Sequence, residues 1–212
     1  AVSDDAAVDA VLLAARLPPG TLVIDHTTTS TAGALARSAR GDLTYVHAPV
    51  FMGPQNALES TGLMLLSGPH VERVRPLVAP MTGKVLDLGP RVDAAAAFKL
   101  MGNTFLMGFT AAIGDLLGLG KALGIPPAEA LSLFEHFNPG TSTLARGRRM
   151  AAADHDHPSW ELAMARKDAR LVLAVPEVDA VPLTSDLAAL LARPAEVVPI
   201  PGDWRRLAED GA

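Results

Sequence analysis

The first ninety residues alternate between the hydrophobic spacing of helices and short apolar runs bounded by turn residues. The short runs predict buried strands at residues 21–25, 43–48, 61–67 and 84–88. Helices are expected between them at residues 4–16, 31–40 and 70–81, and the last would be kinked by Pro76. Strands that alternate with helices indicate an α/β layer built on a mainly parallel sheet.

From residue 92 onward the pattern predicts helices alone. The stretch from Val92 to Leu123 is almost continuously apolar and ends before Gly124, a residue that suits a helix C-terminus. A helix that is hydrophobic on all sides is typical of a buried central helix. Further helices are expected near residues 128–137, 141–153, 160–174 and 183–193. We therefore predict two domains, an α/β domain in residues 1–90 and an all-helical domain in residues 91–212.

Composition narrows the class of protein. The chain has 212 residues, of which 49% are hydrophobic, and this is enough for a packed core. The net charge is -5 and no dense run of Lys or Arg is present, so a nucleic-acid partner is not expected. The chain has no cysteine, which excludes disulfides and Cys-based metal sites. Its first residues lack the layout of a signal peptide, so we expect a cytoplasmic protein.

The long apolar stretch also raises the question of a membrane span. The residues between Lys99 and Lys121 could cross a bilayer by length. However, they include Asn103 and Asp115, and an acidic side chain at mid-membrane costs about 2.5–3.5 kcal/mol. We therefore predict that the protein does not span a membrane.

Lys99 and Asn103 are the most informative polar pair, because they lie four residues apart inside this apolar stretch. The spacing places both side chains on one face of a helix. Burying an unpaired ammonium or amide is costly, so the pair indicates a polar site on the helix. The alternative is a lysine that extends to water beside a hydrogen-bonded asparagine.

Two other polar segments follow predicted strands. The strand at residues 21–25 leads directly into His26, three threonines and Ser30. Ligands of parallel α/β sheets bind at such carboxyl ends, although these hydroxyls could simply cap the next helix. The strand at residues 43–48 leads into Phe51-Met52-Gly53. There a glycine amide could approach an anion, or the segment could be an ordinary loop.

Three further motifs have weaker support. Lys167 and Asp168 are adjacent in a predicted helix, where neighbouring side chains point about 100° apart, so we do not expect them to pair. The alternation of Asp and His at residues 154–157 matches common metal-ligand spacings poorly, and no metal is predicted. The glycines at residues 118–124 resemble a nucleotide-binding loop, but they end a helix and do not follow a strand.

Taken together and in this order, these segments resemble the β-hydroxyacid dehydrogenases, the family that includes 3-hydroxyisobutyrate dehydrogenase and tartronate semialdehyde reductase. The matching segments are Asp25–Thr28 (Asp-x-Ser/Thr-Thr), His47–Gly53 (Asp-Ala-Pro-Val-Ser-Gly-Gly), Lys99–Asn103 (Lys-x-x-x-Asn) and Lys167-Asp168 (Lys-Asp). The resemblance covers nearly the whole chain. It implies a partial Rossmann-like parallel sheet domain followed by an all-α domain with a long central helix.

The resemblance also implies a role for each matched residue. Lys99 would be the catalytic acid and base, and Asn103 would bind substrate. The remaining substrate-binding positions would be Thr29, Ser30, Phe51, Met52 and Gly53, which hold a carboxylate in the family. The cofactor, NAD or NADP, would contact Thr28, Lys167 and Asp168. The chemistry agrees, since desolvation and a positively charged nicotinamide would both lower the pKa of a lysine from about 10.4 toward the working range.

The sequence departs from the family pattern in three places. Phe51-Met52 stands where the family has Ser-Gly, which predicts a larger or less polar substrate. His47 replaces the usual Asp. The Gly-x-Gly-x-x-Gly turn that opens the family's nucleotide-binding domain is not in this sequence, and we expect a leading segment that carries it. The residue that separates NAD from NADP would lie in that segment.

We therefore predict an NAD(P)-dependent oxidoreductase that transfers a hydride between the cofactor and a β-hydroxyacid-like alcohol or its carbonyl product. One alternative is an imine reductase of similar architecture. The other is a non-catalytic dimerisation or binding module that has lost nucleotide binding. Because the long helix is apolar on all sides, we also expect a homodimer that buries it between subunits.

Overall fold

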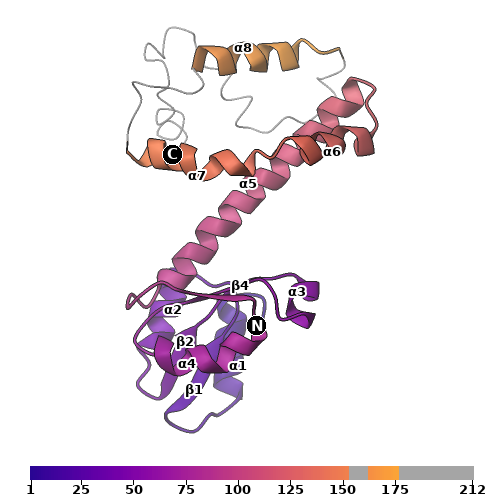
Figure 1. Cartoon of the computed structure of the whole chain (residues 1–212). Coiled ribbons are helices and arrows are strands. Elements are labelled where there is room, and N and C mark those ends of the chain that lie inside the picture. Colours follow the sequence, from indigo (N-terminus) through magenta and orange to yellow (C-terminus); the bar gives the residue numbers. More distant parts are fainter. Residues whose placement is uncertain (153–161, 177–212) are drawn as a thin grey trace. The chain divides into compact units, whose positions relative to one another are not determined.

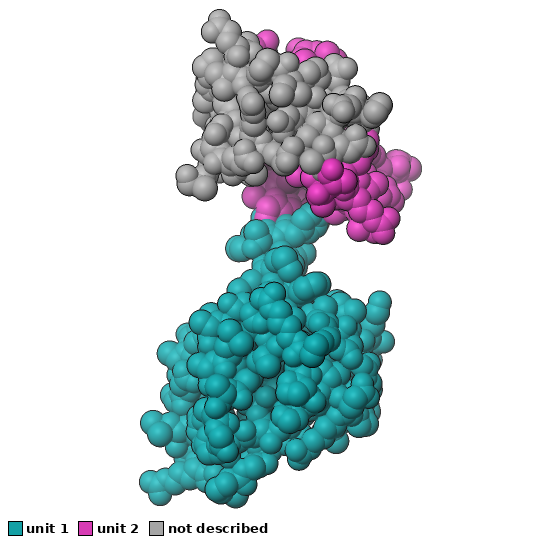
Figure 2. Space-filling model, turned by 90° about the vertical axis from the view of Figure 1, so that its left-hand side faces the viewer, with its two compact units in different colours: residues 1–107 teal, residues 108–212 magenta. Residues whose placement is uncertain are grey.

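The computed structural model describes residues 1–152 and 162–176, and the structural statements below concern these residues (Figure 1). The chain divides into two compact units, residues 1–107 and residues 108–212 (Figure 2). The division falls inside the long helix α5 (Ala94–Ala122). The predicted domain boundary after residue 90 stays a prediction.

The first unit confirms the predicted α/β alternation. Its strands form two ladders. In the first, β1 (Thr21–Asp25) pairs in parallel with β2 (Leu43–His47). In the second, β4 (Leu63–Leu66) pairs in parallel with β5 (Lys84–Asp87). The helices are α1 (Asp5–Ala14), α2 (Thr31–Ser38), α3 (Pro54–Leu58) and α4 (Val71–Val78), and a short 3-10 turn, η1 (Ala79–Met81), follows α4.

One strand was not predicted, and it changes the sheet. Residues Val50 and Phe51 form β3, which pairs antiparallel with β4. Two residues are too few to give a periodic signal, so the sequence predicted only a loop here. The preceding residues link the two ladders, because Ala48 donates its N–H to the Asp25 carbonyl (2.7 Å) and Leu65 donates to the Pro49 carbonyl (2.9 Å). Phe51 is thereby fixed beside the central strands.

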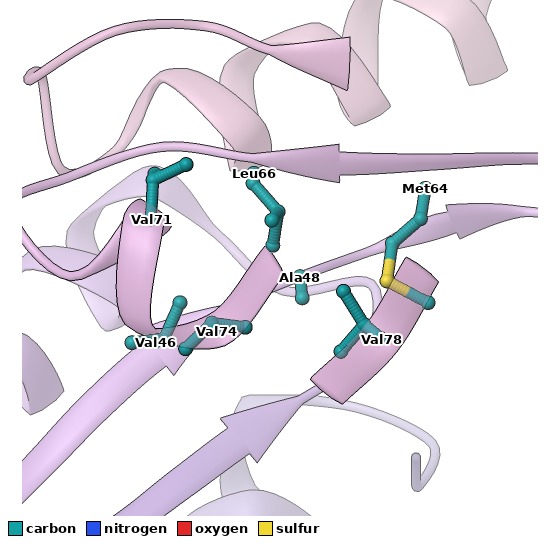
Figure 3. Close-up of a cluster of buried hydrophobic side chains, with 7 residues drawn as sticks. All are labelled: Val46, Ala48, Met64, Leu66, Val71, Val74 and Val78. Atoms are coloured by element: carbon teal, nitrogen blue, oxygen red, sulfur yellow. The ribbon is translucent and has the colours of Figure 1, made fainter. Parts of the chain in front are cut away.

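The core of this unit lies between the strands and α4 (Figure 3). Helix α4 contributes buried valines spaced three and four residues apart, as expected for one helix face. They pack against buried side chains of β2 and β4 and the residue that follows β2. The cluster consists of Val46, Ala48, Met64, Leu66, Val71, Val74 and Val78.

The described part of the second unit is helical, as predicted. It contains the later turns of α5, then α6 (Pro127–His136), α7 (Gly140–Ala151) and α8 (Leu162–Leu173). Gly124 has a φ of 72°, the left-handed conformation that suits the glycine predicted to end the long helix. The helix predicted at residues 183–193 lies outside the described residues.

Helix α5 differs from the prediction of a buried central helix. After a buried start at Ala94, Ala95 and Ala96, the large apolar side chains between residues 98 and 109 are exposed in the single chain, whereas those farther along α5 are half-buried. The exposed side chains include Phe98, Met101, Phe105 and Phe109. The apolar pattern indicates a helix that favours a non-aqueous environment, and the fold of the single chain leaves the large apolar side chains from Phe98 to Phe109 without one. By length and composition α5 could also cross a membrane, and the predicted absence of a span stays a prediction.

Candidate functional site

Lys99 lies in the second turn of α5 and meets an aromatic ring contributed by β3. Its Nζ is 4.1 Å from the centroid of the Phe51 ring, a cation–π contact. The Lys99 side chain is half-buried. Burial disfavours the charged ammonium and lowers the pKa of Lys99 from its ordinary value of 10.5. This is the direction that an acid–base lysine requires.

Two glycines make room for the bulky residues that follow β2. A side chain at Gly102 would overlap the Phe51 ring, so the ring rests directly on the backbone of α5. A Cβ at Gly62 would lie 2.8 Å from Cγ of Met52. The first unit is therefore shaped to hold Phe51 and Met52 in place, which the sequence motifs did not reveal.

Asn103 follows Lys99 by one helical turn, as predicted, and is also half-buried. Residues at this spacing have Cβ atoms about 5–6 Å apart on one helix face. Lys99 therefore has Phe51 as a contact and shares a helix face with Asn103, and all three residues belong to the first unit.

The polar segment after β1 is divided between structural and exposed positions. Thr29 is 3% exposed, and its hydroxyl lies 3.2 Å from Nε2 of His47. Ser30 is the N-cap of α2, where its hydroxyl accepts a hydrogen bond from the Gly33 N–H (3.0 Å). Thr28, between buried Thr27 and Thr29, is exposed. Of the three predicted site residues in this segment, Thr28 and Ser30 are exposed and Thr29 is buried. Ser30 caps α2, so Thr28 is the exposed residue without a capping role.

The Gly53 amide also has a partner inside the chain. It donates to Oδ1 of Asn56 (2.9 Å), and Nδ2 of Asn56 donates in turn to the Thr61 hydroxyl (3.0 Å). Sequence reasoning predicted that this amide could approach an anion. In the structure it instead stabilises the start of α3.

A buried polar network at the ends of β1 and β2 was missed by sequence reasoning. The Asp25 carboxylate accepts hydrogen bonds from the Tyr45 hydroxyl (2.6 Å) and the Thr27 N–H (2.9 Å). Burial alone would raise the pKa of Asp25, but these hydrogen bonds outweigh it and lower the pKa. His47 is 2% exposed and donates from Nε2 to the Thr27 carbonyl (2.7 Å). In the sequence, the signal that could have pointed to this network was His47 itself, which stands where the β-hydroxyacid dehydrogenases have Asp.

The hydrogen bonds of His47 identify its neutral form. Nε2 must carry a proton to donate to a carbonyl, which leaves Nδ1 as the bare nitrogen. Nδ1 is buried and has no hydrogen-bond partner among the described residues. Protonation would create a buried N–H without an acceptor, and burial accordingly lowers the pKa of His47 below its usual 6.5.

This arrangement predicts a loss of stability in mild acid. Because the folded-state pKa of His47 lies below the unfolded value of 6.5, the unfolded chain binds more protons, and the free energy of unfolding rises with pH. The stabilisation is present above pH 6.5 and is lost as the pH falls through the folded-state pKa. One group contributes a slope of at most about 1.4 kcal/mol per pH unit.

Urea unfolding between pH 7.5 and 5, followed by NMR at a labelled Tyr45, measures this slope locally, since Tyr45 is the single tyrosine. His47→Gln keeps a donor for the Thr27 carbonyl but does not titrate, so it should flatten the pH dependence. His26→Gln is the matched control and should leave the pH dependence of the free energy of unfolding unchanged. An equal slope in wild type and His47→Gln would contradict the prediction.

Arg37 forms a second network that holds α1 to α2. Its guanidinium is buried and contacts Asp9 (2.7 Å) and Asp5 (2.9 Å). The hydrogen bond to Asp9, opposed by burial and supported by Asp5, raises the pKa of Arg37 further above its usual value. Arg37 therefore keeps its charge at any working pH and fixes the helix that begins just after the Thr28 segment.

Lys167 and Asp168 lie on α8 in the second unit and correct a prediction. The two neighbours were not expected to pair, yet Nζ of Lys167 lies 2.7 Å from Oδ1 of Asp168. A lysine side chain is long and flexible enough to bend back to the next residue. Both side chains are about half exposed, so the pair contributes little to stability. Their predicted role at the cofactor stays a prediction.

The Asp and His alternation at residues 154–157 lies outside the described residues. Within residues 1–152 and 162–176, no group of three His, Asp or Glu side chains could hold a metal ion.

Comparison with known proteins gives matches both in sequence and in structure. No protein-family model matches the chain. Over 130 residues, 59% of this chain, it is 33% identical to a protein of Mycobacterium tuberculosis H37Rv named probable 3-hydroxyisobutyrate dehydrogenase. The match covers 42% of that protein, so the chain spans less than half the length of the curated relatives it matches.

The structural matches cover most of the chain. A reductive aminase from Aspergillus terreus, in complex with NADPH4, cyclohexanone and allyl amine, aligns with a TM-score of 0.81 at 16% identity, over 100% of this chain and 77% of that one. A 3-hydroxyisobutyrate dehydrogenase from Mycobacterium tuberculosis, with L-serine, aligns with a TM-score of 0.56 at 21% identity, over 90% of this chain and 69% of that one. These likenesses confirm the predicted fold, a Rossmann-like sheet layer followed by helices.

Proposed function

We propose that this chain is a member of the β-hydroxyacid dehydrogenase family and supplies the acid–base lysine of an NAD(P)-dependent oxidoreductase that interconverts an alcohol and a carbonyl compound. The observation that carries the proposal is Lys99 in its Lys-x-x-x-Asn motif. Burial lowers the pKa of this amine. The spacing of four residues puts it on the same helix face as Asn103.

The cofactor in this proposal is NAD or NADP, which structural relatives bind. Thr28 fits such a ligand, because its side chain is exposed at the carboxyl end of β1, where parallel α/β sheets bind ligands. Lys167 and Asp168 are the other two residues that we propose to contact the cofactor. When bound, the nicotinamide would accept or supply the hydride.

Lys99 would move the proton that accompanies the hydride. During alcohol oxidation the neutral amine accepts the hydroxyl proton at Nζ, and during carbonyl reduction the ammonium returns that proton to the forming alkoxide. The lowered pKa makes both forms accessible nearer to neutral pH. The Asn103 amide can hydrogen-bond the substrate oxygen without changing the net charge of the site.

Reduction of a C=N bond is the second candidate. It is supported by the alignment of the whole chain with the reductive aminase from Aspergillus terreus. The two reactions share a hydride donor and differ in the atom that receives the proton. Turnover of a cyclic imine without turnover of any alcohol or carbonyl compound would select this candidate.

We further propose a homodimer and a cytoplasmic location. Support for the dimer is a stripe of exposed apolar side chains on α5, which we call the α5 stripe and define as Phe98, Met101 and Phe105. Contiguous exposed apolar surface is typical of a protein–protein interface, and twofold dimers are the commonest oligomers.

Titration of the longest natural form of the protein with NADH and NADPH tests the proposal. We expect one of the two to bind with a dissociation constant below about 1 mM, the upper range of enzyme affinities for their substrates. Cofactor-dependent turnover of an alcohol, carbonyl compound or imine should follow. If neither cofactor binds, the chain is better explained as a non-catalytic dimerisation or binding module.

A further inference from the structure

We infer that Phe51 excludes carboxylates from the site at Lys99, so that the reacting compounds are neutral alcohols, carbonyl compounds or imines. The inference rests on the proposed function and names the substrate class of the same site. Phe51 is thereby a specificity-determining residue.

The first argument is the contact between the ring and the ammonium. The Phe51 ring centroid lies 4.1 Å from Nζ of Lys99. The face of an aromatic ring attracts a cation through its quadrupole, so the ring occupies one side of the ammonium and closes that side to an anion. A phenyl ring offers no hydrogen-bond donor to a carboxylate in exchange.

The second argument is that the ring cannot move aside without cost. It rests on the backbone of α5 at Gly102, where any side chain would overlap it. Its own backbone belongs to β3, in register with Leu63 of β4. The neighbouring Met52 packs against the hydrophobic core. A carboxylate approaching Lys99 from β3 would have to displace a ring that is held on two sides.

The third argument concerns the donors that could replace the lost lysine contact. The Gly53 N–H donates to Oδ1 of Asn56 at 2.9 Å. The Ser30 N–H donates to Oδ2 of Asp5 at 2.9 Å, so a carboxylate of the protein already occupies that amide. The Thr29 hydroxyl is buried against His47. These three donors, which belong to the segments predicted from the sequence to hold a substrate carboxylate, are thus engaged within the chain.

These observations favour a neutral ligand on physical grounds. Placing a carboxylate against Phe51 and Met52 would remove part of its water, and neither of these side chains supplies a hydrogen-bond donor in return, which is costly for a charged group. A neutral carbonyl compound loses much less on the same transfer. It needs one proton donor at its oxygen or nitrogen, and Lys99 provides that donor.

A matched pair of alcohols tests the inference. 3-Hydroxyisobutyrate and its amide, 3-hydroxyisobutyramide, have the same heavy-atom skeleton and differ in charge. With the longest natural form of the protein and the cofactor it binds, we expect kcat/KM to be at least about 10-fold higher for the amide than for the acid. An equal or higher value for the acid would overturn the inference.

Substitutions at residue 51 identify the cause of the preference. Phe51→Ser uncovers the ammonium and adds a hydroxyl, and it should shift the preference toward the acid by at least about 10-fold. Phe51→Leu keeps apolar bulk without adding a donor, and it should retain the preference for the amide. Phe137→Ser, a change at an exposed phenylalanine of the second unit, should alter nothing. An unchanged preference in Phe51→Ser would overturn the assignment to Phe51.

A binding measurement separates this inference from the proposed function. Isobutyrate is added to the protein while the ¹³Cε resonance of Lys99, assigned with Lys99→Arg, is followed by NMR. We expect no shift in the wild type and a saturable shift in Phe51→Ser. A saturable shift in the wild type would overturn the inference even if no compound turns over. If neither of the two alcohols is turned over, and no carbonyl compound or imine is turned over either, the proposed function is overturned instead.

Discussion

Replacement of Lys99 by alanine is expected to lower kcat by about 10²-fold or more while cofactor binding is largely kept. The physical reason is that loss of a positioned acid–base group usually removes this much of the rate. Lys99 lies on α5 and not in the Thr28 segment, so we do not expect the substitution to disturb the cofactor's proposed contacts there. The measurement is kcat for a compound that the wild type turns over, together with the dissociation constant of the cofactor.

The substitution Lys99→Arg distinguishes proton transfer by Lys99 from the effect of its positive charge. Arginine keeps a cation that can lie over the Phe51 ring, but it does not release a proton in the working range. We therefore expect a loss of kcat comparable with that of Lys99→Ala. If Lys99→Arg retained most of the activity, Lys99 would act through its charge and would not be the proton carrier.

The pH profile gives a further check on the same residue. Oxidation of the alcohol needs the neutral amine, so its rate should rise with pH through an apparent pKa below 10.5, because burial lowers the pKa of Lys99. Reduction needs the ammonium, so its rate should fall with pH through the same group. A profile for Lys99→Arg with the wild-type inflection would assign the titration to another residue.

The second large effect is expected at the α5 stripe. Phe105→Asp should weaken the proposed dimer by about 10³-fold or more, because a buried aromatic anchor contributes at least about 2 kcal/mol and a twofold interface contains it twice. Phe105 is 57% exposed in the single chain, so the substitution should leave folding of the first unit intact. Sedimentation equilibrium at micromolar concentration measures the change.

Leu13→Asp is the matched control for this experiment. Leu13 lies on α1 and is 81% exposed. Leu13→Asp therefore also replaces an exposed apolar side chain by a charged one. We expect it to leave the dimer unchanged. A wild-type mass equal to one chain at micromolar concentration would exclude the dimer, and dissociation by Leu13→Asp would show that the effect of charge is not specific to α5.

Much of the secondary structure was predictable from residues that are neighbours in the sequence. Strand β1 and the long helix were located by continuous apolar runs, and the end of α5 was marked by Gly124, whose φ of 72° favours glycine. β3 was not predictable, because two residues carry no periodicity and its pairing with β4 joins segments far apart in the chain. The Lys167–Asp168 contact was missed for a different reason, since it depends on how a flexible side chain bends and not on helical spacing.

The sequence by itself determined the α/β-then-α order and the motif that contains Lys99 and Asn103, because local periodicity and residue type are written in consecutive positions. Only the tertiary structure decided what these residues meet. It placed the Phe51 ring over the Lys99 ammonium, paired the Gly53 amide with Asn56 and buried His47 with no partner for Nδ1 in the described part of the chain. Burial, cation–π contacts and hydrogen bonds depend on distances between segments that lie far apart along the chain, and folding alone sets those distances.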